Sequence, residues 1–350
     1  MHLILDAMAD GLSYAQALWI QADWYEDHGY PLAAQSLRRQ RTPRGFLPTY
    51  SPWKVVAAGY RHAVALTAAG KPVSWQYDSV SGAASGVVFP FHPLSFQTPP
   101  DVRIEDVAAG DCHNVGLTAQ GDVLLWGYGA RDWLRVPSGL KAVRIHSGQY
   151  HVLAIRPTGE VTAWGWDPET TVPVPEGLQA IALAGGSRHS LALTPEGEVL
   201  GWGENLQGQL DIPVGLRAIG LAAGNHHSAA LTPQGDVVVW GNHKAPYRRM
   251  LPGTSLVAVQ AGGPYTGVLT AQGDVLVWSE EEHPQKIPFP DPVVYFALGR
   301  SLCTALLDQG TIAVWDIPGW CSRDVPEKIK AEGEEREETE KDLIPDTRKV

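Results

Sequence analysis

Hydrophobic and polar positions alternate along most of this chain in short runs, and the runs recur at a regular spacing. Residues 218–241 show the unit: the apolar stretch AIGLAAG, then SAALT, the polar turn PQGD and the apolar stretch VVVWG. Short apolar stretches rich in β-branched and aromatic residues, bounded by glycine and proline, predict strands joined by tight turns. The glycine of PQGD supplies a permissive backbone for such a turn. The pattern therefore predicts an all-β chain.

One glycine–glycine–tryptophan frame underlies the repeat. A second glycine follows the first after eleven positions and a tryptophan follows after sixteen, and the seven copies are Gly59/Gly70/Trp75, Gly110/Gly121/Trp126, Gly148/Gly159/Trp164, Gly186/Gly197/Trp202, Gly224/Gly235/Trp240, Gly262/Gly273/Trp278 and Gly299/Gly310/Trp315. Eight prolines bound the seven units: Pro48, Pro99, Pro137, Pro175, Pro213, Pro252, Pro288 and Pro326. A unit this small cannot bury both faces of its strands, whereas a closed ring of such units can. We expect that ring over residues 48–326.

The repeat pattern resembles that of a known family. The units follow G-x-x-H-[S/A]-x-x-L-x-x-x-G-x-[V/L]-x-x-W-G, and the segment GENLQGQLDIP at 203–213 is similar to the tail of the RCC1 repeat. The resemblance is to the regulator of chromosome condensation family, with a short period like that of bacterial arrays. It implies a seven-bladed β-propeller. Tyr265 and Leu302 replace the repeat histidine in the last two units, and most units lack the tail.

The two ends of the chain lie outside the repeat. In residues 1–47, Ser13 can cap a helix that Gly29 ends, and Pro31 can open a second helix. This small helical segment resembles the bacterial repeat-companion domain. Residues 327–350 are rich in Glu and Lys and predict a disordered acidic tail.

Composition narrows the function classes. A net charge of −11 argues against nucleic-acid binding, which needs a basic surface. The chain has no apolar run of membrane-spanning length, so no membrane span is expected. Three cysteines form neither a disulfide framework nor a metal-ligand set, and the N-terminus lacks a basic start. We therefore expect a cytoplasmic protein and a monomer.

Five repeat positions carry histidine: His62, His113, His151, His189 and His227. Equivalent positions in a propeller are spread around the ring, too far apart to share one ion, so no metal site is predicted. A repeated hydrogen bond that fixes each turn is the favoured interpretation, and the seven tryptophans are expected to fill space between blades. No phosphate-binding loop, HExxH motif or nucleophile elbow occurs. We therefore predict no catalytic residues, no cofactor and no enzyme.

The two variable residues inside each G-x-x-H turn are the candidate binding site. The seven pairs should ring one face of the disc, and loops on a rigid scaffold commonly carry function. Tyrosine and arginine are favoured at binding hot spots. The candidate partner-binding residues are Tyr60, Arg61, Asp111, Gln149, Tyr150, Arg188, His226 and Arg300.

The predicted function is a protein–protein interaction module with an unknown protein partner. Two alternatives follow from the resemblance. One is a guanine-nucleotide exchange factor for a small GTPase, with the insertion at residues 76–98 as its candidate wedge. The other is a propeller-type enzyme inhibitor, against which the missing signal sequence weighs.

Overall fold

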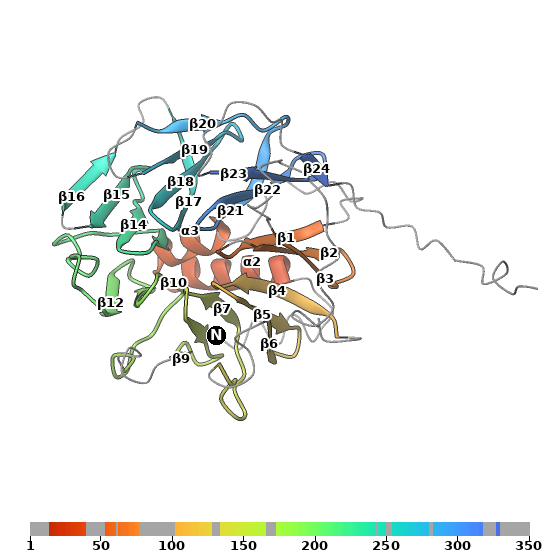
Figure 1. Ribbon diagram of the computed structural model, residues 1–350. Coiled ribbons are helices and arrows are strands. Elements are labelled where there is room, and N and C mark those ends of the chain that lie inside the picture. Colours follow the sequence, from red (N-terminus) through yellow and green to blue (C-terminus); the bar gives the residue numbers. More distant parts are fainter. Residues whose placement is uncertain are drawn as a thin grey trace, which may run out of the picture.

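Seven small antiparallel sheets are arranged in a ring in the computed structural model (Figure 1). The structure describes residues 14–39, 53–60, 62–76, 102–127, 134–165, 173–242, 244–249, 254–279, 283–317 and 327–329. Each sheet is built from strands that are consecutive in the sequence, so the described blades do not exchange strands. The fold is a seven-bladed β-propeller, as predicted.

The first four blades contain three strands each. They are β1 (Trp53–Ala58), β2 (His62–Thr67) and β3 (Pro72–Gln76); β4 (Ile104–Ala109), β5 (His113–Thr118) and β6 (Val123–Gly127); β7 (Arg144–Ser147), β8 (His151–Ile155) and β9 (Val161–Gly165); and β10 (Ala182–Gly185), β11 (His189–Leu193) and β12 (Val199–Gly203). In each blade the first strand contacts the first strands of the neighbouring blades and is therefore innermost.

The last three blades contain four strands each. They are β13 (Gly220–Ala223), β14 (His227–Leu231), β15 (Val237–Gly241) and β16 (Lys244–Arg249); β17 (Leu256–Gly262), β18 (Tyr265–Thr270), β19 (Val275–Trp278) and β20 (Gln285–Ile287); and β21 (Val293–Leu298), β22 (Leu302–Leu307), β23 (Ile312–Asp316) and β24 (Glu327–Ile329). The expectation of a disordered tail from residue 327 is wrong for its first three residues, because their backbone pairs with the open edge of β23.

The two glycines of the repeat frame have different structural roles. The second glycine of every unit lies in the turn between the second and third strands with φ between 76° and 93°, as the sequence predicts. The first glycine allows neighbouring blades to approach closely. A Cβ atom on any of the seven would lie 2.8 Å or less from a backbone oxygen of the next blade, and the last of these approaches, Gly299 to Gly59, closes the ring.

The five repeat histidines join neighbouring blades. In each pair the Nε2 atom lies 2.8–3.0 Å from a polar atom of the next blade: His62 with Asn114 Oδ1, His113 with Ser147 Oγ, His151 with Ser190 Oγ, His189 with Ser228 Oγ and His227 with Thr266 Oγ1. The predicted hydrogen bond is confirmed, and its partner lies on the adjacent blade. Burial lowers the pKa to about 4 for His62, His151 and His227 and to about 3 for His113 and His189, so all five are neutral at pH 7.

Ser228 connects two of these contacts at the junction of the fourth and fifth blades. Its hydroxyl donates to the Gln209 carbonyl oxygen at 2.8 Å, so Ser228 Oγ acts as the acceptor for His189 Nε2, which lies 3.0 Å away. Trp240 Nε1 donates to the same carbonyl at 2.9 Å. The glycine-bearing tail at 203–213 therefore has a structural role, because it carries Gln209 into the blade interface.

Replacing Ser228 with alanine is expected to lower the free energy of unfolding by about 1–3 kcal/mol, because a buried His189 donor loses its acceptor. Urea unfolding followed by circular dichroism measures the change. Thr158→Ala is the control: its hydroxyl is exposed and contacts only a neighbouring glutamate, so the expected change is within about 0.5 kcal/mol. Equal effects of the two variants would contradict this role of Ser228.

Two N-terminal helices cover one end of the ring. They are α2 (Tyr14–Asp27) and α3 (Pro31–Arg39), separated by Gly29 at φ +84°, which confirms the predicted helix pair. Leu32 of α3 lies against the turn at Gly197, and Tyr25 of α2 lies within electrostatic reach of Glu196 in the same turn. The helices therefore sit over the centre of the ring at the end that carries the second-glycine turns (Figure 1).

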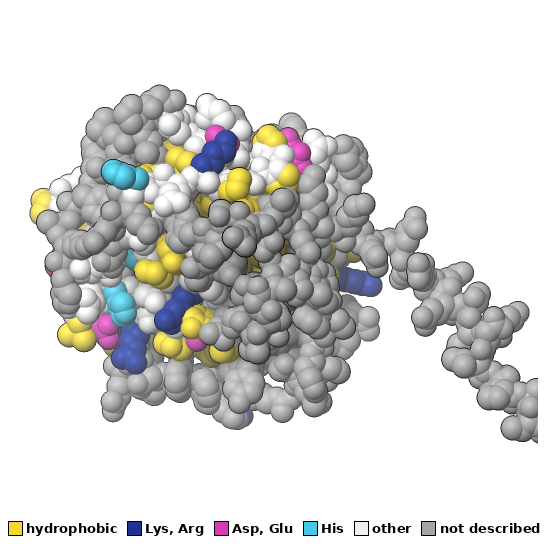
Figure 2. All heavy atoms as spheres, turned by 45° about the horizontal axis from the view of Figure 1, so that its top comes forward, with side chains coloured by type: hydrophobic (Ala, Val, Ile, Leu, Met, Phe, Trp, Pro, Cys, Tyr) yellow, Lys and Arg dark blue, Asp and Glu magenta, His cyan; other side chains and the backbone are white. Residues whose placement is uncertain are grey.

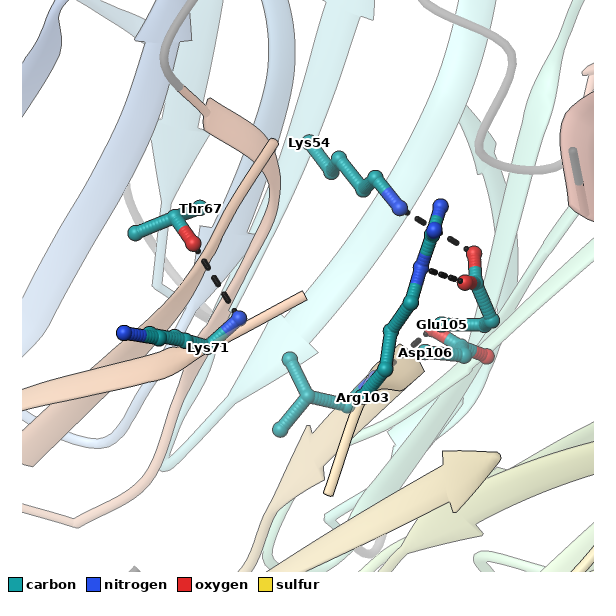
Figure 3. Close-up of polar contacts among 7 residues, drawn as sticks. Lys54, Thr67, Lys71, Arg103, Glu105 and Asp106 are labelled. Atoms are coloured by element: carbon teal, nitrogen blue, oxygen red, sulfur yellow. Dashed lines mark hydrogen bonds and ion pairs between the residues drawn. The ribbon is translucent and has the colours of Figure 1, made fainter. Parts of the chain in front are cut away.

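A buried carboxylate links the first two blades at that same end. Glu105 at the start of β4 is 5% exposed and binds Lys54 Nζ of β1 at 3.1 Å and Arg103 Nε at 2.7 Å (Figure 3). A carboxylate this deeply buried is tolerated because both of its oxygens are paired with cations. The sequence repeat does not predict this contact, since the equivalent positions of the last five units are apolar.

Candidate functional site at the axial mouth

The seven G-x-x-H turns converge on a cavity at the propeller axis, at the end opposite the helices. The cavity has a volume of about 80 Å³, room for several water molecules. The first residue of every variable pair lines it: Tyr60, Asp111, Gln149, Ser187, Asn225, Gly263 and Arg300. The sequence predicts a ring of pairs on one face. The structure adds that the first residue of each pair faces the axis, and we call this opening the axial mouth.

The backbone around the axial mouth is largely paired from blade to blade. The bonds are Asp111 N to Gln149 O, Gln149 N to Gly186 O, Ser187 N to Gly224 O, Asn225 N to Gly263 O and Arg300 N to Gly59 O, at 2.8–3.4 Å. These amides are therefore not available to a ligand. Selectivity at the mouth must come mainly from its side chains.

The side chains divide the axial mouth into two unlike arcs. The seventh, first, second and third blades supply Arg300, Tyr60, Asp111 and Gln149, whereas the fourth, fifth and sixth supply only Ser187, Asn225 and Gly263. Charge and aromatic surface thus gather on one side. Ser187, Asn225 and Gly263 are not among the residues predicted from the sequence, because none is a typical hot-spot type.

Arg300 and Tyr60 meet where the ring closes. The guanidinium carbon of Arg300 lies 4.6 Å from the centroid of the Tyr60 ring, a cation–π contact. Beside it, Ser301 Oγ donates to the Tyr60 carbonyl at 2.7 Å. Stacking holds the guanidinium at the mouth while its side chain stays exposed.

Asp111, Gln149 and Tyr150 form a polar group next to this pair. Gln149 Nε2 donates to Tyr150 Oη at 2.9 Å and to Asp111 Oδ1 at 3.4 Å. Burial raises the pKa of the Asp111 carboxyl, with Gln149 and Arg300 opposing the shift. Burial and the Asp111 charge raise the pKa of Tyr150, and the charges of Arg300 and Arg188 oppose this. The phenol is therefore within electrostatic reach of three other blades.

The second residues of the pairs lie further out. Arg188 and His226 are exposed, and Arg188 Nη1 lies 3.6 Å from Glu204 Oε2, a contact that sequence reasoning did not predict. Arg61 lies outside the described residues. Cys112 is a free, exposed thiol beside Asp111.

The described part of the chain holds neither a cluster of metal ligands nor a membrane-spanning helix. Among those residues, no group of three or more His, Cys, Asp or Glu could hold a metal ion. No helix there is long and apolar enough to cross a membrane. On the side of the molecule shown in Figure 2, coloured charges of both signs are scattered and do not form one large patch.

The sevenfold ring around an axial mouth defines a β-propeller, and a sequence comparison identifies the repeat. Residues 180–209, which contain β10 to β12, match the family described as the regulator of chromosome condensation (RCC1) repeat. The same glycine–glycine–tryptophan frame recurs in all seven units. The chain is therefore an RCC1-like seven-bladed propeller. No curated protein matches the sequence.

Solved structures with this architecture come from distant sequences. The CRINKLY WD40 ectodomain of the Arabidopsis thaliana receptor kinase ACR4 superposes with a TM-score of 0.61 at 19% identity, covering 79% of this chain and 98% of that one. The ectodomain of the Physcomitrella patens receptor kinase CR4 gives 0.56 at 18% identity, with coverages of 75% and 74%. Prp20p of Saccharomyces cerevisiae gives only 0.45 at 21% identity, covering 82% and 79%.

Proposed function

We propose that this propeller is a non-catalytic protein-binding module whose partner docks on the face that carries the G-x-x-H turns. The observation that carries the proposal is the convergence of all seven turns on one axial mouth. The opposite end is covered by α2 and α3, which leaves this face as the available end of the axis. Rigid blades that present variable turns are a common way to build a binding surface.

The residue types at the axial mouth support a protein partner. Tyr60, Tyr150, Arg188 and Arg300 belong to the types enriched in interface hot spots, and they lie on four different blades. Arg300 stacks on Tyr60, while Gln149 and Glu204 hold Tyr150 and Arg188, so these side chains are in place before a partner arrives. Such preorganisation lowers the entropy cost of binding.

Affinity capture from the native cell tests the proposal. We expect a variant with alanine at Tyr60, Arg61, Tyr150, Arg188 and Arg300 to lose the proteins that the wild-type chain retains. The matched control replaces Lys141, Arg217 and Lys286, whose exposed ion pairs lie near second-glycine turns at the opposite end. Retention of the same proteins by both variants would exclude this face as the binding surface.

The family resemblance also suggests an exchange factor or an enzyme inhibitor, but no observation on the described residues favours either function. The candidate exchange-factor wedge at 76–98 is described only at Gln76, and no feature of the mouth indicates an inhibitor. The monomeric state and the cytoplasmic location stay predictions, as does the bacterial origin that the resemblance to bacterial repeat arrays implies.

A further inference from the structure

The variable pairs of the G-x-x-H turns carry a net charge opposite in sign to that of the whole chain. The fourteen residues of the seven variable pairs include three arginines and one aspartate, a net charge of +2, whereas the chain carries −11. Glu204 already pairs with Arg188, so among the described pairs Arg300 carries the positive charge that is left to attract an acidic partner, while the negative charge of the rest of the chain repels such a partner. This contrast rests on the proposed function, because it concerns the same surface.

Arg300 is the group best prepared to bind an anion. Its guanidinium stacks on Tyr60 at 4.6 Å and makes no hydrogen bond, and no ion pair within 4 Å, with any described residue. A stacked guanidinium keeps its N–H edge free, and that edge matches the two oxygens of a carboxylate. Because stacking already orders the side chain, less rotamer entropy is lost when the carboxylate binds.

The neighbours of Arg300 restrict which anion fits. Two further polar groups lie near Arg300: Arg188, which pairs with Glu204, and the Tyr150 hydroxyl, which accepts a hydrogen bond from Gln149. Asp111 places one negative charge within electrostatic reach of Arg300. That charge penalises a doubly charged phosphate more than a singly charged carboxylate.

We propose that the partner is an acidic protein segment that places an Asp or Glu carboxylate against Arg300 at the axial mouth. Tyr60 on the adjacent first blade and Tyr150 on the third blade contact the segment beside Arg300. Asp111 limits the affinity for more highly charged anions. The proposal thus names the chemistry of the partner that the proposed function leaves open.

Peptide selection on the intact chain tests this proposal. A library of random peptides displayed on phage is panned against the immobilised full-length protein, and selected peptides are synthesised for fluorescence anisotropy. We expect Asp and Glu to be enriched. For these peptides, Arg300→Gln should weaken binding about 10- to 100-fold, the loss of one hydrogen-bonded charge pair. Asp111→Asn should strengthen binding, because it removes a like charge.

The control variant and the alternative outcomes separate the two proposals. Arg217→Gln removes an exposed charge at the helix-covered end and should leave the peptide affinity unchanged. Neutral or basic selected peptides that still lose binding in the five-alanine variant would overturn the carboxylate proposal alone. Selected peptides that bind the five-alanine variant as tightly as the wild type, or no selection at all, would overturn the proposed function with it.

Discussion

Lowering the pH from 8 to 5 is expected to unfold the propeller. Five buried histidines have folded pKa values of about 3 to 4, against about 6.5 in the unfolded chain. Between these values the unfolded chain binds more protons than the folded one, so the free energy of unfolding falls as the pH falls. At pH 5 the loss is about 2 kcal/mol per histidine, or about 10 kcal/mol for five. A typical domain has only about 5–15 kcal/mol to lose.

Thermal unfolding followed by circular dichroism from pH 8 to pH 5 measures this effect. We expect Tm to be nearly constant above pH 7 and to drop steeply below pH 6. His189→Gln should make the fall in Tm below pH 6 less steep, because one of the five histidines that bind a proton on unfolding is gone. His283→Gln is the control, because this histidine is exposed, lies between β19 and β20 and is not among the five buried ones, so the fall in Tm below pH 6 should stay unchanged. The same Tm at pH 7 and pH 5 would show that the blade interfaces tolerate charged histidines.

These histidines show what the sequence predicts well. The spacing of the repeat frame predicts the blade number, the turns at the second glycines and a hydrogen bond from each histidine. Outside the repeat, the capping and breaking residues of the N-terminal segment predict the helix pair on either side of Gly29. Each of these features depends on local backbone chemistry that repeats seven times or is marked by a helix-capping residue, so single-sequence reasoning reaches it.

The features that the sequence does not predict depend on contacts between distant units. The repeat indicates that the variable pairs share a face, but not that Tyr150 of the third blade comes within electrostatic reach of Arg300 of the seventh. Nor does it indicate that α3 places Leu32 against the turn at Gly197. Such contacts depend on how the closed ring brings distant blades and the helices together, and a periodic sequence pattern does not encode that arrangement.

Ring closure follows from the same inter-blade geometry. In the described residues no strand crosses from the first blade into the seventh. The ring closes through the approach of Gly299 to Gly59, the Arg300 amide bond to the Gly59 carbonyl, and the stacking of Arg300 on Tyr60. The closing contact therefore contributes directly to the candidate binding site, and a ligand held by Arg300 would also stabilise the closed ring.

Replacing Gly186 with alanine is expected to destabilise the propeller by about 3 kcal/mol, the upper end of the usual cost of overpacking. The new Cβ atom would lie 2.5 Å from the Gly224 carbonyl oxygen and even closer to the His189 ring. The carbonyl belongs to the backbone of the next blade, so the overlap is relieved only if the two blades separate. That separation would lengthen the hydrogen bond between His189 and Ser228 and the backbone bond from Ser187 to Gly224.

Urea unfolding measures the free energies of unfolding of Gly186→Ala and Gly220→Ala. Their difference separates the effect of the close approach between blades from the general effect of adding a methyl group. Gly220 lies in the innermost strand of the next blade, its φ is not positive, and a Cβ atom there would meet its nearest neighbour at 3.4 Å. We expect the Gly220 variant to stay within about 1 kcal/mol of the wild type, because alanine also reduces the entropy of the unfolded chain. If Gly186→Ala proves equally mild, the first glycines of the frame do not set the spacing between blades. A selective loss at Gly186 would show that the missing side chain at this position lets the fourth and fifth blades approach to their observed spacing beside the axial mouth.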